Sequence, residues 1–302
     1  MDERKRFLGH TAALATVCVW GSTFAAVVIL LRSFTPVEIL FFRFGIAALA
    51  LNLIYPKRMG KTTWKQEAYF LAAGLTGVTM YFLFQDFALT HTAASNVGVI
   101  VAISPVFTVL LTWGFLSKER PKLQFFLGAL LAIGGIGLIS FAGSQLELHP
   151  DGDLLAVGAA LSWAVYSVLL KKIGTFGFHT IQITRRIFLY GLICLIPVIL
   201  VSDFHLGLER FTEWQNLVSI LFLGLGASAV CFALWSFSLD QLGAVKTSVY
   251  IYLVPLVTVI VSVLFLRDTV TWLKAAGIGM TLAGLALSNR KSNRERDAIE
   301  KA

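Results

Sequence analysis

Charged residues are scarce in this sequence. Only 14% of its 302 residues are Asp, Glu, Lys or Arg, 57% are hydrophobic, and the mean hydropathy is +0.79. An ordinary soluble domain has about 25% charged residues, and so few charges could not cover a soluble fold of this length. Disordered chains are polar and poor in aromatic residues, so 24 Phe and 7 Trp exclude disorder as well. The composition predicts an integral membrane protein.

Other absences narrow the function. The three cysteines, Cys18, Cys194 and Cys231, lie in apolar stretches without a CxxC spacing, which argues against a disulfide framework. The nucleotide-binding pattern GxxxxGK[ST], the zinc-protease pattern HExxH and the hydrolase pattern GxSxG do not occur. The five histidines show no metal-ligand spacing. We therefore expect no cofactor, no metal and no enzymatic activity.

Long apolar runs fill the chain instead. A helix needs about 20 apolar residues to cross the hydrocarbon core of a bilayer, and its backbone groups must be satisfied internally there. The sequence thus predicts an all-α integral membrane protein with ten transmembrane helices. The predicted spans are 8–31, 36–55, 67–89, 93–116, 123–142, 153–172, 180–201, 214–239, 243–266 and 272–289.

Basic residues are distributed unevenly between these spans. With the N-terminus placed in the cytoplasm, the inner segments and ends carry 17 Lys and Arg and the outer segments carry four. Inner loops of membrane proteins are enriched in Lys and Arg, so both termini are predicted to be cytoplasmic, including a basic tail at 290–302. The net charge of +8 is then an orientation signal, and we expect no nucleic acid partner.

The second half of the chain resembles the first. Residues of the same type recur at an offset of 143 or 150 positions, among them Trp20 and Trp163, Arg43 and Arg186, Phe82 and Phe232, and Pro105 and Pro255. Each copy holds five predicted spans, an odd number, so the second copy must lie inverted in the membrane. We expect two inverted five-helix repeats, 1–146 and 147–302. This architecture is typical of transporters, with the substrate site between the repeats near the midplane.

The repeated residues belong to patterns that resemble a known family. The first copy contains Trp20-Gly21-Ser22, Phe41-Phe42-Arg43-Phe44, Phe87-Ala88-Leu89, Pro105-Val106-Phe107 and Glu119. The second contains Phe237-Ser238-Leu239, Gly243-Ala244, Pro255-Leu256 and Asp268. In this order and spacing the chain resembles the EamA family of the drug/metabolite transporter superfamily over nearly its whole length. It departs from the family pattern at Ala164, which follows Trp163, and at Asp268, where Glu is usual.

The resemblance implies secondary transport across the inner (plasma) membrane, usually export of amino acids or other small metabolites. We therefore predict a transporter that moves a small organic solute by alternating access, with protons as a further partner if the transport is coupled. A membrane enzyme acting on a lipid or isoprenoid would need a clustered catalytic set, and a receptor would need a long loop or extra domain. The sequence contains neither feature. The sequence does not distinguish a coupled transporter from a passive facilitator. It also does not identify the substrate, the direction of transport or the oligomeric state.

Four basic residues lie within predicted spans, so the excess of Lys and Arg in the inner segments does not account for them. They are Arg43, Arg185, Arg186 and Lys246. A charge inside a span is costly and marks a functional candidate. Arg43 lies seven residues after Pro36, or ~10 Å along a helix, at a depth similar to that of Asp86. An ion pair between Arg43 and Asp86 would serve as an outer gate or substrate carboxylate site, or as a static link between two spans. Asp86 is also the candidate proton site.

The inverted repeat predicts that Arg186 lies in the inner half, where it would alternate with Arg43 as a gate. Arg185 lies about 100° around the helix, so only one of the two can face the cavity. Lys246 is expected near the inner end of its span. It either forms an anion or zwitterion site there or extends its ammonium group to the membrane surface.

Aromatic and neutral polar residues within spans complete the candidate substrate-binding or gating set. These are Trp20, Tyr81, Gln85, Asn96, Trp163, Tyr166 and Tyr250. Aromatic rings can hold a cation or stack on a flat substrate, although they also fill gaps between helices. Pro105 and Pro255 are predicted kinks, which act either as hinges or as static bends. Glycine-rich stretches at 134–137 and 277–279 allow close helix contact, either as packing within the chain or as a dimer surface.

Overall fold

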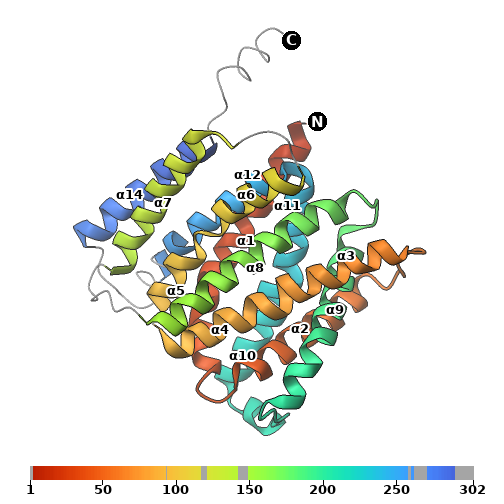
Figure 1. Ribbon diagram of the computed structural model, residues 1–302. Coiled ribbons are helices and arrows are strands. Elements are labelled where there is room, and N and C mark those ends of the chain that lie inside the picture. The colour runs from red at the N-terminus through yellow and green to blue at the C-terminus, as the bar shows by residue number, and fades with distance from the viewer. Residues whose placement is uncertain are drawn as a thin grey trace.

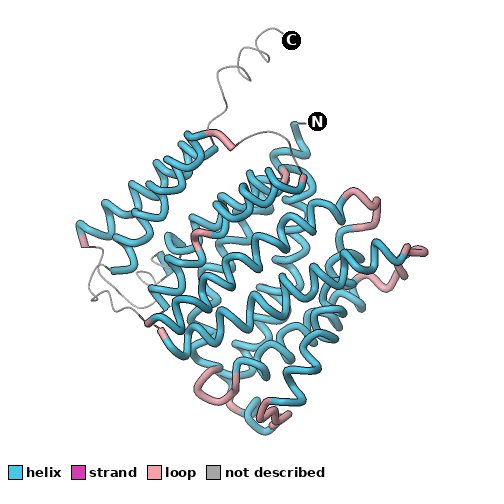
Figure 2. The backbone as a smooth tube through the Cα atoms, viewed as in Figure 1, coloured by secondary structure: helices cyan, strands magenta, loops and turns pink. Residues whose placement is uncertain are grey.

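The computed structural model describes residues 3–92, 94–116, 121–141, 149–257, 260–261 and 271–289. All regular structure in these ranges is helical (Figure 2). Seven helices are long and apolar enough to cross a membrane: Glu3–Leu30, Pro36–Ile54, Trp64–His91, Val97–Phe115, Pro150–Gly174, Thr180–Val201 and Trp214–Leu242. Shorter apolar helices at Leu123–Ile139, Ala244–Val257 and Trp272–Ser288 occupy the remaining predicted positions. The predicted tail 290–302 lies outside the described residues.

Local sequence signals determine where several helices begin. Helix α1 (Glu3–Leu30) ends in a tight turn, and Thr35 then caps α2 (Pro36–Ile54). The Thr35 hydroxyl accepts a hydrogen bond from the amide of Glu38, whose carboxylate binds the amide of Thr35 in return. This capping box satisfies amide groups that the first turn of a helix leaves free. Equivalent caps begin α3 (Trp64–Gly74) and α9 (Thr180–Val201).

Two long spans contain a π-helical segment in the middle. The first runs through α3, η1 (Leu75–Met80) and α4 (Tyr81–His91). The second runs through α10 (Trp214–Leu221), η3 (Phe222–Val230) and α11 (Cys231–Leu242), after the short 3-10 helix η2 (Leu208–Thr212). A π turn interrupts the regular hydrogen-bond ladder and is common at functional sites. Hydrophobicity alone did not predict these segments, because the residues remain helical and apolar.

Two other predicted spans are interrupted immediately before a proline. One consists of α5 (Ala94–Val101), a turn at 102–103 and α6 (Ser104–Phe115), so Pro105 is the second residue of a new helix. The other has α12 (Ala244–Ser248), the 3-10 helix η4 (Val249–Leu253) and helical residues that begin just before Pro255. The regular helix is thus interrupted at both prolines, as a kink requires, and the role of either proline as a hinge or a static bend stays a prediction. A proline at a helix start loses no backbone hydrogen bond, which explains its position.

Helices α7 (Leu123–Phe141) and α14 (Trp272–Asn289) lie side by side at one edge of the molecule (Figure 1). Their glycines allow the backbones to touch, because a Cβ atom on Gly135 would lie 2.6 Å from the carbonyl oxygen of Gly277. The expected close helix contact is confirmed for this pair, and it joins two helices of one chain.

The main core lies between α2, α3–α4, α8 (Pro150–Gly174), α9 and α11 (Figure 1). Helices far apart in the sequence thus share one interior. Corresponding helices of the two halves begin at nearly the same offset. The offset is 150 residues for α4 and α11 and for α5 and α12, and 149 residues for α7 and α14. The core therefore joins the two halves that the sequence offset relates.

Candidate functional site

Aromatic side chains from both halves of the chain meet in the core and form the central aromatic cluster. Its members are Trp20 of α1, Phe44 of α2, Tyr81 and Phe82 of α4, Trp163 and Tyr166 of α8, Phe188 of α9, and Phe232 and Trp235 of α11. The ring centroid of Trp20 lies 5.2 Å from that of Trp163 and 5.0 Å from that of Trp235. The predicted residues Trp20, Tyr81, Trp163 and Tyr166 are thus brought together.

The three indole N–H groups of the cluster have different surroundings. Trp20 Nε1 donates a hydrogen bond of 2.9 Å to the carbonyl oxygen of Ala227 in η3, where the π turn leaves carbonyl groups available. Trp163 Nε1 and Trp235 Nε1 are buried and have no hydrogen-bond partner among the described residues. A buried indole N–H normally has a partner. These two donors can therefore bind an acceptor supplied by a ligand.

Arg43 borders the cluster and is 2% exposed. Its guanidinium carbon lies 4.2 Å from the ring centroid of Phe82 and 5.3 Å from that of Phe44. Its Nε donates a 2.7 Å hydrogen bond to Ser228 Oγ, also in η3. A guanidinium group has five N–H donors, and aromatic faces attract its charge without using them. Among the described residues, the hydrogen bond to Ser228 uses one of these donors, which leaves others for a further acceptor.

Asp86 and Gln85 lie on α4 beside this arginine. Asp86 is fully buried, its Oδ1 accepts a 3.5 Å hydrogen bond from Gln85 Nε2, and its Oδ2 has no partner in the described part of the chain. The charges of Arg43 and Asp86 interact through space. No ion pair within 4.0 Å joins them among the described residues, because Arg43 is directed to Ser228 instead. The anticipated direct pair is therefore absent.

Arg186 lies away from the central aromatic cluster, at one end of the helix bundle. This end also holds Glu67 and the segment 55–63, and it is called the Glu67 end below. Its Nε and Nη2 donate to the two carboxylate oxygens of Glu67 at 3.1 and 2.5 Å. Tyr190 and Thr62 donate to the same carboxylate. Arg186 thus does not face the core cluster, because a carboxylate on the neighbouring helix α3 binds it.

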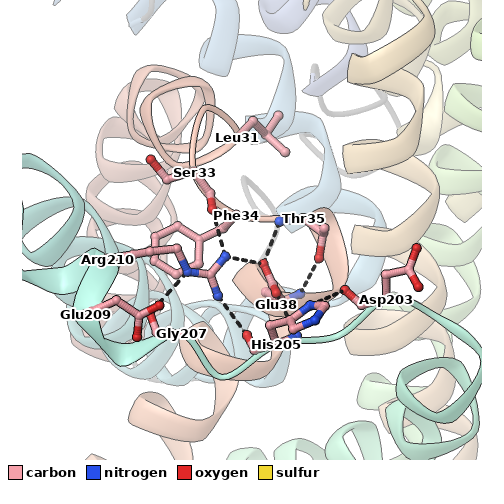
Figure 3. Close-up of a pocket in the computed structure, with 10 residues that line it drawn as sticks. All are labelled: Leu31, Ser33, Phe34, Thr35, Glu38, Asp203, His205, Gly207, Glu209 and Arg210. Carbon is pink, nitrogen blue, oxygen red and sulfur yellow. Dashed lines mark hydrogen bonds and ion pairs between the residues drawn. The ribbon is translucent and has the colours of Figure 1, made fainter.

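The opposite end, called the Glu38 end, has an ion pair that the sequence reading missed. Glu38 Oε2 accepts hydrogen bonds from Arg210 Nη1 at 2.9 Å and from the Thr35 amide at 2.8 Å. Glu38 Oε1 accepts a third, of 2.9 Å, from the His205 amide. Figure 3 shows these side chains around a cavity of about 490 Å³. The Thr-x-x-Glu pattern signals the cap, but nothing local indicates a partner 172 residues away.

Two further predicted residues, Lys246 and Tyr250, are not members of the central aromatic cluster. Lys246 is exposed on α12. The hydroxyl of Tyr250 forms a 2.7 Å hydrogen bond with Nδ1 of His10 on α1. The backbone of Asn96 belongs to α5, but its side chain lies outside the described residues. A search of the described residues finds no group of three or more His, Cys, Asp or Glu able to hold a metal.

Comparison with known protein families identifies the family to which the chain belongs. The EamA-like transporter family matches residues 7–141 and, a second time, residues 151–290. The chain belongs to this family. The resemblance found in the sequence is thereby confirmed, and the chain is a multi-pass membrane protein of a transporter family.

Curated relatives of this EamA-like protein are also named as transporters. An uncharacterized transporter of Archaeoglobus fulgidus is 29% identical over 94% of this chain and 98% of its own length. A protein of Streptantibioticus cattleyicolor named a probable terminal-alkyne amino-acid exporter is 26% identical over 95% of each chain. A protein of known crystal structure is 20% identical and superposes with a TM-score of 0.73 over 96% of this chain and 98% of its own, which shows a shared fold.

Proposed function

We propose that this protein is a secondary transporter that exports an amino-acid-like solute across the plasma membrane by alternating access. It crosses the membrane ten times, as two inverted repeats of five spans at 1–146 and 147–302, with both termini in the cytoplasm. The Glu67 end then faces the cytoplasm and the Glu38 end faces outward. The central aromatic cluster and the adjacent Arg43 and Asp86 form the substrate site.

The matching halves support this architecture. The family pattern occurs twice, and helices at corresponding places begin 149 or 150 residues apart. Five spans per repeat require the second copy to be inverted, and such repeats can exchange conformations to open the two ends in turn. The excess of Lys and Arg in the inner segments supports the orientation.

One observation carries the substrate class: Arg43 and Asp86 are buried, and the indole N–H groups of Trp163 and Trp235 in the central aromatic cluster have no partner among the described residues. A carboxylate fits the free donors of Arg43, which in a low-dielectric site bind it strongly. An ammonium group fits Asp86 Oδ2 and the faces of the rings. A zwitterion with an apolar side chain satisfies both groups at once. The name of the relative from Streptantibioticus cattleyicolor agrees with this class.

Asp86 is also the proposed site of proton coupling. It is a fully buried carboxyl group with one oxygen free of protein hydrogen bonds among the described residues. A buried carboxyl that exchanges a proton while substrate is absent would couple transport to the proton gradient. A passive facilitator would need no such group.

The decisive experiment measures efflux of labelled amino acids, supplied as a mixed pool, from proteoliposomes with and without a pH gradient. We expect wild-type protein to transport apolar amino acids and Arg43→Gln to do so roughly tenfold to hundredfold more slowly, because a charge-assisted bond of about 1.5–3 kcal/mol is lost. Arg32→Gln is the matched control, because Arg32 is exposed in the turn after α1. An Arg43→Gln variant as fast as this control would contradict the substrate site.

The same assay tests coupling with Asp86→Asn. The expected result is transport that no longer responds to the pH gradient, while counterflow at equal pH continues. If Asp86→Asn keeps both the full rate and the gradient response, proton coupling through this residue and its contact with the substrate ammonium group are both refuted, and only the Arg43 part of the substrate site stands.

A further inference from the structure

A second cavity, of about 410 Å³, lies at the Glu67 end between the last turns of α2 and the first turns of α9. The segment after α2 forms part of its wall, and the central aromatic cluster does not contribute to it. Arg58, Arg185 and Arg186 line it, together with the neutral polar residues Asn52 and Gln182. None of the lining residues is acidic. The cavity is therefore strongly basic and separate from the proposed substrate site.

The arginines of this cavity differ in how their charges are balanced. Arg186 is neutralised by Glu67, which does not line the cavity. Arg185 binds two backbone carbonyl oxygens, those of Tyr55 at 2.8 Å and Lys57 at 3.0 Å. These bonds fix the guanidinium group without neutralising it, and three of its five N–H donors stay available. With the exposed Arg58, the cavity presents two positive charges that no acidic side chain of the described residues pairs, and one of them is held in place.

Exposed leucines lie on the two helices that form the cavity. Leu189 lines the cavity and is 46% exposed, and α2 presents Leu49 and Leu53 beside Asn52 with 62% and 74% exposed. All three lie in candidate membrane spans. A soluble anion would use only the arginines, whereas a phospholipid would also cover these leucines with its acyl chains. Basic pockets between membrane helices are suited to anionic head groups.

We propose that this cavity binds the head group of an anionic phospholipid, with the phosphate between Arg58 and Arg185 and the acyl chains along Leu189 and Leu49. Two oxygens of a phosphate can accept parallel hydrogen bonds from one guanidinium group, and the carbonyl contacts of Arg185 hold its guanidinium group in place for this. The site does not depend on which solute the protein transports. It would anchor the start of α9, the helix that carries Arg186.

The test is native mass spectrometry of the full-length protein in detergent, titrated with dioleoyl phosphatidylglycerol and, separately, with dioleoyl phosphatidylcholine. We expect tighter binding of phosphatidylglycerol to the wild-type protein. The double variant with Arg58→Gln and Arg185→Gln should bind phosphatidylglycerol roughly 30-fold more weakly, because each lost charge near the membrane weakens binding about fivefold. Lys65→Gln together with Lys172→Gln is the control, since both lysines are exposed at the same end and neither lines the cavity.

Two outcomes would overturn the proposal. One is equal binding of phosphatidylglycerol by the arginine variant and the lysine control. The other is displacement of the lipid by glycerol 3-phosphate at similar concentration, because the exposed leucines would then contribute nothing and the ligand would be a soluble anion. Arg58→Gln alone keeps the carbonyl contacts of Arg185 and should weaken binding about fivefold, so a folding defect of the double variant does not decide the result.

Discussion

The two ends of the helix bundle are each joined by a glutamate and an arginine, but the two ion pairs are built differently. At the Glu38 end the carboxylate is 1% exposed and Arg210 is 23% exposed. At the Glu67 end the carboxylate is 18% exposed and Arg186 is 36% exposed. Burial strengthens an ion pair once formed and makes an unpaired partner costly. The Glu38 pair is therefore the harder one to break.

The partners of the two carboxylates differ as well. Glu38 binds the backbone amides of Thr35 and His205 besides Arg210, so it connects the α1–α2 turn to the segment before η2. Among the described residues, the partners of the Glu67 carboxylate are side chains, those of Arg186, Thr62 and Tyr190. Side chains can rotate away from a carboxylate, whereas amides move only with the chain. We infer that the Glu67 end opens at a lower cost in free energy than the Glu38 end.

The largest expected effect is that of Glu38→Gln. The amide group of glutamine would place an N–H donor against the donors that surround this position and leave Arg210 without its counter-ion. We expect a loss of about 3 kcal/mol in the free energy of unfolding. Unfolding in mixed micelles with a rising fraction of dodecyl sulfate measures it. The control is Glu209→Gln, an exposed glutamate at the same cavity. A change no larger than that of the control would remove the difference between the two ends.

Glu67→Gln should have a smaller effect. Because Arg186 is more than one third exposed, water and salt screen the pair, and we expect a loss of about 1 kcal/mol. The same unfolding measurement at low and high salt checks this value, with Glu3→Gln as the exposed control on α1. A loss equal to that of Glu38→Gln would show that burial does not distinguish the two pairs.

Tyr190→Phe should have the smallest effect. It removes the hydroxyl that donates to Glu67 and keeps the ring against Arg186, whose guanidinium carbon lies 5.5 Å from the ring centroid. We expect about 0.5 kcal/mol, because water can replace the hydroxyl at this partly exposed position. Double-variant analysis with Glu67→Gln provides the check. Additive losses would mean that the hydroxyl does not act through the carboxylate.

Much of the fold could be predicted because hydrophobicity and length dictate helices in a bilayer. The apolar runs, the contact between glycine-rich helices and the meeting of Trp20 with Trp163 follow from composition, spacing and the internal offset. The π turns and the interruptions before Pro105 and Pro255 depend on how each helix packs on its neighbours, and apolar residues suit either backbone. The members of the candidate site were predicted only in part, and Trp235 was missed. The residue 150 positions before it is Gln85, so the internal repeat offers no second tryptophan that would have pointed to Trp235.

The sequence by itself determined the membrane class, the helical architecture, the family and the set of charges that lie within spans. Only the tertiary structure decided which partner each of those charges meets. Arg43 binds Ser228 and Arg186 binds Glu67, across separations of 185 and 119 residues. Arg210, which lies between two predicted spans, likewise binds Glu38 across 172 residues. A buried charge must find a partner, but which one is within hydrogen-bonding distance depends on the packing of whole helices, and no local pattern records that geometry.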